Sequence, residues 1–205
     1  MNLFAIMICT SPDRKHLLKR LLDEFDRLSF EDEYLIILNN TKTEKQGGPT
    51  TGAKRNTLVD AAIQAGATHG AFFDDDDIPG PTYLQRNQEA TNGDYDTAEL
   101  WGQYYEHSKQ MNPFHHSLAH KKWWQDNKFY YRCPNHLNCM KLEKVKDIKF
   151  LDRTFGEDGN WSEDIQKAGV LKTEYPVKEI TYYYFHGKRN YSLEPSMAKK
   201  RGTKL

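Results

Sequence analysis

The sequence lacks any long apolar run. Its 205 residues contain no stretch that approaches the roughly 20 apolar residues of a membrane span, and no basic leader with an apolar segment opens the chain, so we expect neither a span nor a signal peptide. Cysteine is scarce as well. The three cysteines follow no metal-ligand spacing, which argues against a disulfide framework or a cysteine zinc site and favours a reducing cytoplasm, bacterial or of a phage-infected host.

The sequence also lacks a net charge. Its 29 basic residues balance 29 acidic ones, so no overall field attracts the chain to nucleic acid or to an anionic membrane. The charge is uneven, however, since residues 191–205 carry four basic side chains and one acidic one. We expect these residues to form a basic C-terminal arm, either a solvated tail or a clamp for phosphate groups. A hydrophobic content of 38% suits one globular domain over residues 1–190.

Strand patterns alternate with helix patterns in the first 75 residues. Residues 3–9, 33–38 and 69–73 are apolar runs, as expected for strands buried on both faces. Between them, apolar residues recur at helical spacing over 17–28 and 58–65. Because parallel strands need crossover helices, this order predicts an α/β fold with a mostly parallel central sheet flanked by helices.

Each of the three predicted strands ends in a polar cluster, at residues 10–14, 39–40 and 74–77. Ligands of such sheets bind beyond the carboxyl ends of the strands, so we expect the clusters to meet at one rim. The third cluster is four consecutive aspartates, whose hard oxygens suit Mg²⁺ or Mn²⁺ together with substrate phosphates. A second interpretation stays open, in which Asp77 is the acidic N-cap of a helix that begins in residues 78–84.

Lys54 and Arg55 lie near the start of the second predicted helix, just after Gly52, which allows a close approach of the chain. Cations at a helix N-terminus oppose its dipole and so cost stability. The position therefore favours a bound anion such as a diphosphate over a solvated first turn.

These motifs together resemble a known family. GAKRNTLVDAA at 52–62 followed by AFFDDDDIPGPTYL at 71–84 resembles the core of family 2-like glycosyltransferases of the GT-A fold, where a helix with an Arg-Asn pair precedes a strand ending in Asp-x-Asp. ICTSPDR at 8–14 is similar to the first strand and turn of these enzymes, and FGEDGNW at 155–161 to their acidic pair. The resemblance implies one GT-A, Rossmann-like domain, with a nucleotide-sugar half at about 1–100 and an acceptor half at about 101–190.

The resemblance implies a metal site and a nucleotide site. Asp74 and Asp76 match the outer positions of Asp-x-Asp, with Asp76 as the direct metal ligand and Asp74 nearer the ribose, although Asp75 and Asp77 fit the motif as well. His186 is implied as a further metal ligand, and its interpretation as a packed, hydrogen-bonded histidine stays equally open. The nucleotide side is implied to comprise Thr10, Ser11, Arg14, Asn39, Asn40, Lys54, Arg55, Asn56, Asp74 and Asp75. Because the family usually has an acidic residue where Asn39 and Asn40 stand, the choice of uracil stays open.

The acidic pair is implied to supply the catalytic base. Asp158 is the first candidate and Glu157 the second, with a helix cap as the alternative role. The segment at 135–141 precedes this pair and is expected to line the acceptor side. Trp123, Trp124 and Trp161 are interpreted either as a platform for a ring or as core.

The function implied is metal-dependent transfer of a hexosyl or pentosyl group from a nucleotide-sugar, with a UDP-sugar favoured, to an acceptor hydroxyl, with inversion. We place a glycan acceptor ahead of a hydroxymethylated base in phage DNA, because nucleic-acid-binding proteins usually carry excess positive charge. Two alternatives stay open: a Mg²⁺-dependent nucleotidyltransferase, which would release pyrophosphate, and a non-catalytic nucleotide-sugar-binding module. The oligomeric state is not predicted.

Overall fold

The protein is described by a computed structural model over residues 2–28 and 30–187, so the predicted basic arm at 191–205 lies outside the described residues. The helices are α1 (Lys15–Asp26), α2 (Thr51–Gln64), α3 (Tyr83–Asn92), α4 (Leu142–Val145) and α5 (Glu157–Ala168), with short 3-10 helices at Pro12–Arg14 and Glu44–Gln46. The strands are β1 (Phe4–Cys9), β2 (Tyr34–Asn39), β3 (His69–Phe72), β4 (Ile78–Pro79), β5 (Thr97–Ala98), β6 (Leu100–Glu106), β7 (Lys109–His116), β8 (Trp124–Gln125), β9 (Tyr130–Arg132), β10 (Met140–Lys141), β11 (Glu174–Tyr175) and β12 (Tyr182–His186). No helix in the described part of the chain is both long and apolar enough to cross a membrane.

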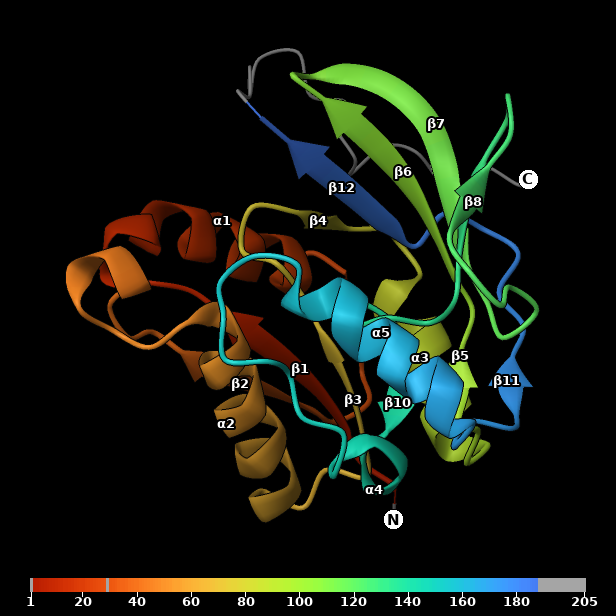
Figure 1. Cartoon of the computed structure of the whole chain (residues 1–205), viewed down its shortest axis with the longest axis horizontal. Coiled ribbons are helices and arrows are strands. Elements are labelled where there is room, and N and C mark those ends of the chain that lie inside the picture. Colours follow the sequence, from red (N-terminus) through yellow and green to blue (C-terminus); the bar gives the residue numbers. More distant parts are fainter. Residues whose placement is uncertain (1, 29, 188–205) are drawn as a thin grey trace.

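The first sheet has the strand order β11-β5-β10-β3-β1-β2. The predicted α/β class is confirmed, and β1 pairs in parallel with β2 and β3 as expected. The sheet is mixed, however, because β10 runs antiparallel to both β3 and β5. The chain returns to this sheet at β10 from the second sheet, which reverses its direction (Figure 1).

Burial on both faces explains the unbroken apolar run of β1. Phe4, Ile6 and Ile8 pack in one core cluster with residues of α1 and α3. The alternate residues Ala5 and Met7 pack in a second cluster with α2, α4 and α5. Because neither face of β1 meets water, neither set of positions tolerates polar side chains.

The second sheet has the order β4-β12-β6-β7-β9-β8, and Figure 1 shows β12, β6 and β7 beyond the carboxyl ends of β1 and β3. Gly102 of β6 makes room for the ring of Phe114 opposite it on β7, since a Cβ at Gly102 would lie 1.9 Å from that ring. Phe114 and Tyr182 join the core cluster that contains Phe4. This contact fixes the second sheet above the rim where the polar clusters lie.

The two alternative interpretations as helix caps are wrong. Asp77 does not cap a helix, because the chain after it forms β4 and α3 begins only after Thr82. Glu157 and Asp158 lie inside the first turn of α5, whose N-cap is Gly156 at a φ of 72°. Glycine adopts this left-handed conformation without the steric cost of a side chain.

Candidate active site

A cavity of about 740 Å³ lies between the two sheets. Its walls are Arg14, Arg55, Asp74 and Asp76 at the rim of the first sheet, residues 135–137 and 154–158, and Tyr104, Tyr130, Arg132, Tyr184 and His186 of the second sheet. A smaller cavity of about 240 Å³ adjoins it and shares Arg14, Arg55, Asp74 and Asp76. Thr10, Ser11 and Lys54 line this smaller cavity, together with Thr43 and Thr51, which the sequence did not single out.

The four consecutive aspartates point in different directions, and Asp75 and Asp77 are held by hydrogen bonds from other parts of the chain. Asp75 accepts a hydrogen bond of 2.6 Å from the hydroxyl of Thr10, is held by the guanidinium of Arg14, and also lines the smaller cavity. Asp77 is fully buried and accepts hydrogen bonds from the Tyr182 hydroxyl at 2.7 Å and the Phe185 N–H at 2.8 Å. Asp74 and Asp76 face the large cavity. The geometry therefore favours the Asp74–Asp76 register of the motif.

Asp74 and Asp76 differ in their charge environment. Burial raises the pKa of Asp74, but His136, Arg55 and Arg14 together lower it below its ordinary value. The pKa of Asp76 is raised, first by burial and then by the charge of Asp74, although Arg14 lies 3.0 Å from it. The two carboxylates repel each other, so a cation bound between them would lower the electrostatic energy of the site.

Arg55 has internal anions as partners. Its buried guanidinium lies 2.8 Å from Glu157 and 3.5 Å from Asp74. Lys54 also has protein partners, since its amine donates to the carbonyls of Thr10 and Thr41. The sequence predicts an anion beside Lys54 and Arg55. In the structure Glu157, 102 residues from Arg55 in the chain, provides a negative charge there.

The acidic pair is divided between two roles. Glu157 is buried against Arg55, and burial raises its pKa above the ordinary value although Arg55 lowers it. Asp158 has a third of its side chain exposed and faces the large cavity. Asp158 is therefore the carboxylate of this pair that can meet a substrate.

His136 connects the two sides of the cavity, and sequence reasoning did not single it out. Its Nε2 lies 3.8 Å from Asp74 and its Nδ1 lies 3.8 Å from Asp158. The ring is buried, and neither nitrogen has a hydrogen-bond partner within the described chain. A distance of 3.8 Å is beyond hydrogen-bond length. A small movement of Asp74 or of Asp158 would bring that carboxylate within hydrogen-bond distance of the ring.

Buried asparagines hold the loop that carries His136. The Asn135 side chain accepts from the Leu137 N–H at 3.0 Å, and the Asn138 side chain accepts from the Asn135 N–H at 3.0 Å. The carbonyl of His136 accepts from Phe72 at the end of β3. The NHLN sequence at 135–138 was the available signal, since a polar run buried in a core needs its own hydrogen bonds.

Several predicted residues lie outside the two cavities. Asn39 bonds to Thr57 and Thr41, Asn40 is exposed, and neither lines a cavity. The side-chain amide of Asn56 donates to and accepts from the main chain of Phe150. Ser11, in contrast, lines the smaller cavity, although its hydroxyl donates to Asp13.

The residues fit a divalent cation that is shared with a ligand. His186 is exposed at the rim of the large cavity, and over residues 2–28 and 30–187 no three His, Cys, Asp or Glu side chains are grouped to hold a metal ion. Mg²⁺ sites often use only one or two carboxylates, with waters and substrate phosphates in the other positions. Asp74 and Asp76 meet that description.

The aromatic residues expected on the acceptor side have different environments. Trp161 stacks on Phe150 in the core, and Trp124 stacks on Tyr131 at the surface. Trp123 is partly exposed and covers the guanidinium of Arg132 at 4.4 Å. Arg132, which Trp123 covers, lines the large cavity.

The described fold is similar to that of S. aureus TarS. TarS 1–349 in complex with UDP-GlcNAc gives a TM-score of 0.60 at 13% identity, over 98% of this chain and 62% of that chain. A second structure of TarS 1–349 gives a TM-score of 0.59 at 16% identity over 90% of this chain and 60% of that chain, and the UDP complex gives 0.56 at 12% identity over 91% and 61%. This chain thus spans about three fifths of those TarS chains. No protein-family model and no curated protein matches the sequence. The similarity confirms the GT-A fold that the sequence motifs predicted.

Proposed function

We propose that this protein is a nucleotide-sugar glycosyltransferase. The observation that carries the proposal is the convergence of Asp74, Asp76 and Asp158 on one cavity, with His136 between the two sides. A group transfer from a diphosphate needs charge stabilisation on one side and a base on the other. The TarS structures with UDP-GlcNAc and UDP support a UDP-sugar as the donor.

The donor would lie across the rim of the first sheet. The smaller cavity beside Thr10 and Lys54 takes the nucleoside, and the diphosphate reaches Asp74 and Asp76 where the two cavities meet. Mn²⁺ or Mg²⁺ held by these carboxylates would neutralise charge on the diphosphate as the sugar leaves. Arg14 lines both cavities and lies 3.0 Å from Asp76, so its guanidinium is placed to orient a phosphate as well.

Asp158 is the proposed catalytic base. It faces the cavity without a strong ion-pair partner, whereas Glu157 is bound to Arg55. In the reaction, the acceptor oxygen bonds to the anomeric carbon of the sugar, the bond to the diphosphate breaks, and Asp158 takes the hydroxyl proton. A base on the wall opposite the diphosphate favours attack from the far side, and so inversion at the anomeric carbon.

The proposal is tested by product analysis. The protein is incubated with UDP-GlcNAc or UDP-glucose and Mn²⁺, with water or simple glycosides as acceptors, and the phosphorylated products are separated. The proposal predicts UDP and a sugar product of inverted configuration, and loss of both in Asp158→Asn. Release of pyrophosphate would indicate a nucleotidyltransferase instead, and tight UDP-sugar binding with no product would indicate a binding module.

A further inference from the structure

Arg132 differs from the other two arginines that line the large cavity. Arg14 is paired with Asp75 and Asp76, and Arg55 is paired with Glu157 and Asp74. Arg132, at the end of β9, forms no ion pair and its guanidinium makes no hydrogen bond among residues 2–28 and 30–187. Its guanidinium carbon lies over the face of Trp123, 4.4 Å from the ring centroid.

The guanidinium of Arg132 is partly withdrawn from water without gaining a counter-charge. Burial lowers the pKa of Arg132 despite the favourable charge of Asp158 nearby. Opposite Arg132 on β7 lies His116, a buried histidine whose pKa is lowered, first by burial and then by the charge of Arg132. A desolvated cation raises the energy of the free protein, and a ligand anion at this place would lower it.

Three tyrosines form the wall beside Arg132. Tyr184 of β12 and Tyr104 of β6 are paired in register, and their ring centroids lie 5.6 Å apart. Tyr130 follows at 6.0 Å from Tyr104, two residues before Arg132 on β9 and therefore on the same face of the sheet. The wall thus offers aromatic faces with one unpaired cation at its end, and all four residues line the cavity.

We infer that Arg132 and this tyrosine wall form an acceptor subsite for an anionic glycan, in which a sugar ring packs on the tyrosines and its phosphate or carboxylate binds Arg132. The inference rests on the proposed glycosyltransferase function and adds the charge of the acceptor to it. Arg132 lies on the Asp158 side of the cavity, where the acceptor must sit, and the planar guanidinium suits a two-oxygen group. Aromatic faces pack well on the apolar face of a sugar ring.

A nucleic-acid acceptor fits this wall less well. Binding to DNA neutralises several phosphates and depends on several cations along a track. The cavity offers one arginine without a carboxylate partner, and the chain as a whole is neutral. The subsite is therefore built for a single anionic group next to a ring.

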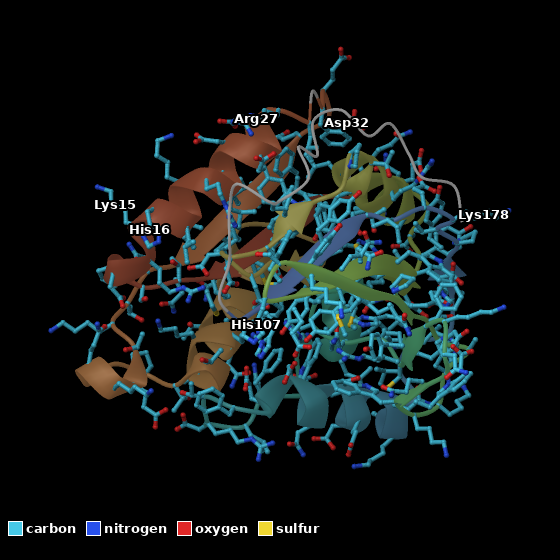
Figure 2. The ribbon with its side chains drawn as sticks, turned by 90° about the horizontal axis from the view of Figure 1, so that it is seen from above. Lys15, His16, Arg27, Asp32, His107 and Lys178 are labelled. Carbon is cyan, nitrogen blue, oxygen red and sulfur yellow. The ribbon has the colours of Figure 1, made fainter. Side chains whose placement is uncertain are left out.

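The test measures binding of simple probes by tryptophan fluorescence, because Trp123 contacts the guanidinium directly. Wild type, Arg132→Met and Arg132→Lys are titrated with methyl glucoside 6-phosphate, glucuronate, neutral methyl glucoside and a short single-stranded DNA. Arg27→Met is the matched control, since Arg27 lies at the end of α1 on the outside of the molecule, paired with Glu24 (Figure 2). UDP binding is measured on each variant by calorimetry as the check of the donor site and of folding.

The inference predicts that a charged sugar binds wild type at least about tenfold more tightly than the neutral glucoside, and that Arg132→Met loses this preference. Arg132→Lys retains part of it, Arg27→Met all of it, and UDP affinity is unchanged throughout. Equal binding of charged and neutral sugars, or a preference that survives in Arg132→Met, would overturn the inference. So would Arg132-dependent binding of DNA without binding of the charged sugars. Absence of UDP binding in wild type would instead count against the glycosyltransferase itself.

Discussion

Glu157 and Asp158 are adjacent in sequence, yet we expect their loss to have opposite consequences. Glu157→Ala removes the carboxylate 2.8 Å from the buried Arg55 and leaves Asp74, at 3.5 Å, as its remaining partner. Removal of one member of a buried ion pair costs about 3–5 kcal/mol, and the remaining carboxylate places this case near the lower value. Asp158→Asn removes a charge from a side chain that is one-third exposed, so its cost in stability is below about 1 kcal/mol.

These free energies translate into melting temperatures. With an unfolding entropy of about 2.1 cal/mol/K per residue, a chain of 205 residues has about 0.43 kcal/mol/K in total. A loss of about 3 kcal/mol then lowers the melting temperature of Glu157→Ala by about 7 °C, and Asp158→Asn changes it by about 2 °C or less. The melting temperature of Glu157→Gln, which keeps a hydrogen-bond acceptor for Arg55, should lie between those of the other two variants.

Turnover should respond in the opposite order, with a large loss in Asp158→Asn and a small one in Glu157→Gln. Loss of a general base lowers turnover by about 100-fold to 10,000-fold, so Asp158→Asn should fold normally and release almost no UDP from the sugar donor. Glu157→Gln should retain measurable turnover below its melting temperature. Differential scanning fluorimetry and a UDP-release assay on the same preparations measure both quantities. If Glu157→Ala melted with wild type, or Glu157→Gln were as inactive as Asp158→Asn, the division of roles would be wrong.

Three further predictions concern His136, Glu174 and Gly52. His136→Gln should lower turnover about 100-fold through misplaced carboxylates while UDP affinity stays within about threefold; equal losses in both would mean a purely structural histidine. Burial raises the pKa of Glu174, and a carboxyl with a raised folded pKa contributes stability that is complete below its unfolded value of 4.5 and lost as pH rises through the folded value. Glu174→Gln should therefore gain in melting temperature relative to wild type between about pH 4 and pH 8, and a constant difference would refute this. Gly52→Ala places a Cβ 1.9 Å from the Leu151 carbonyl and should cost about 1–3 kcal/mol, whereas Gly159→Ala, with 3.8 Å to its nearest neighbour, should not.

Three strands of the first sheet, β1, β2 and β3, could be predicted because their signals are local, whereas β5, β10 and β11 are only two residues long and were not predicted. The run at 3–9 has no polar position because β1 is buried on both faces, and the helix at Thr51–Gln64 follows from periodicity. The second sheet gave weaker signals. Its strands β8 and β9 are only two and three residues long, too short for an alternation of apolar and polar residues to be recognised.

Within the site, the sequence indicated the chemical groups but not their partners. The aspartate cluster was recognised, yet only the folded chain shows that Asp74 and Asp76 face the large cavity while Asp75 and Asp77 are held by Arg14 and Tyr182. Such contacts join segments that are 61 and 105 residues apart in the chain. No local pattern encodes a pairing over that distance.

His136 and Arg132 were missed for the same reason. The importance of His136 comes from its place between two carboxylates of other segments, and that of Arg132 from the absence of a counter-charge among the described residues. The sequence predicts a ligand anion at the start of α2, and the structure shows a carboxylate of the protein there. This carboxylate belongs to Glu157, which only the folded chain brings to Arg55.

The most direct test of the central claim is the melting temperature of the protein with UDP, GDP, CDP and dTDP, each with Mn²⁺ and with EDTA, alongside Asp76→Asn. A ligand at 100 times its dissociation constant adds about 2.7 kcal/mol, or about 6 °C for a chain of this size. We predict a shift of this size for UDP that requires Mn²⁺ and disappears in Asp76→Asn. Flat curves for all four nucleotides, with and without metal, would contradict the account and leave the aspartates as a buried acidic turn.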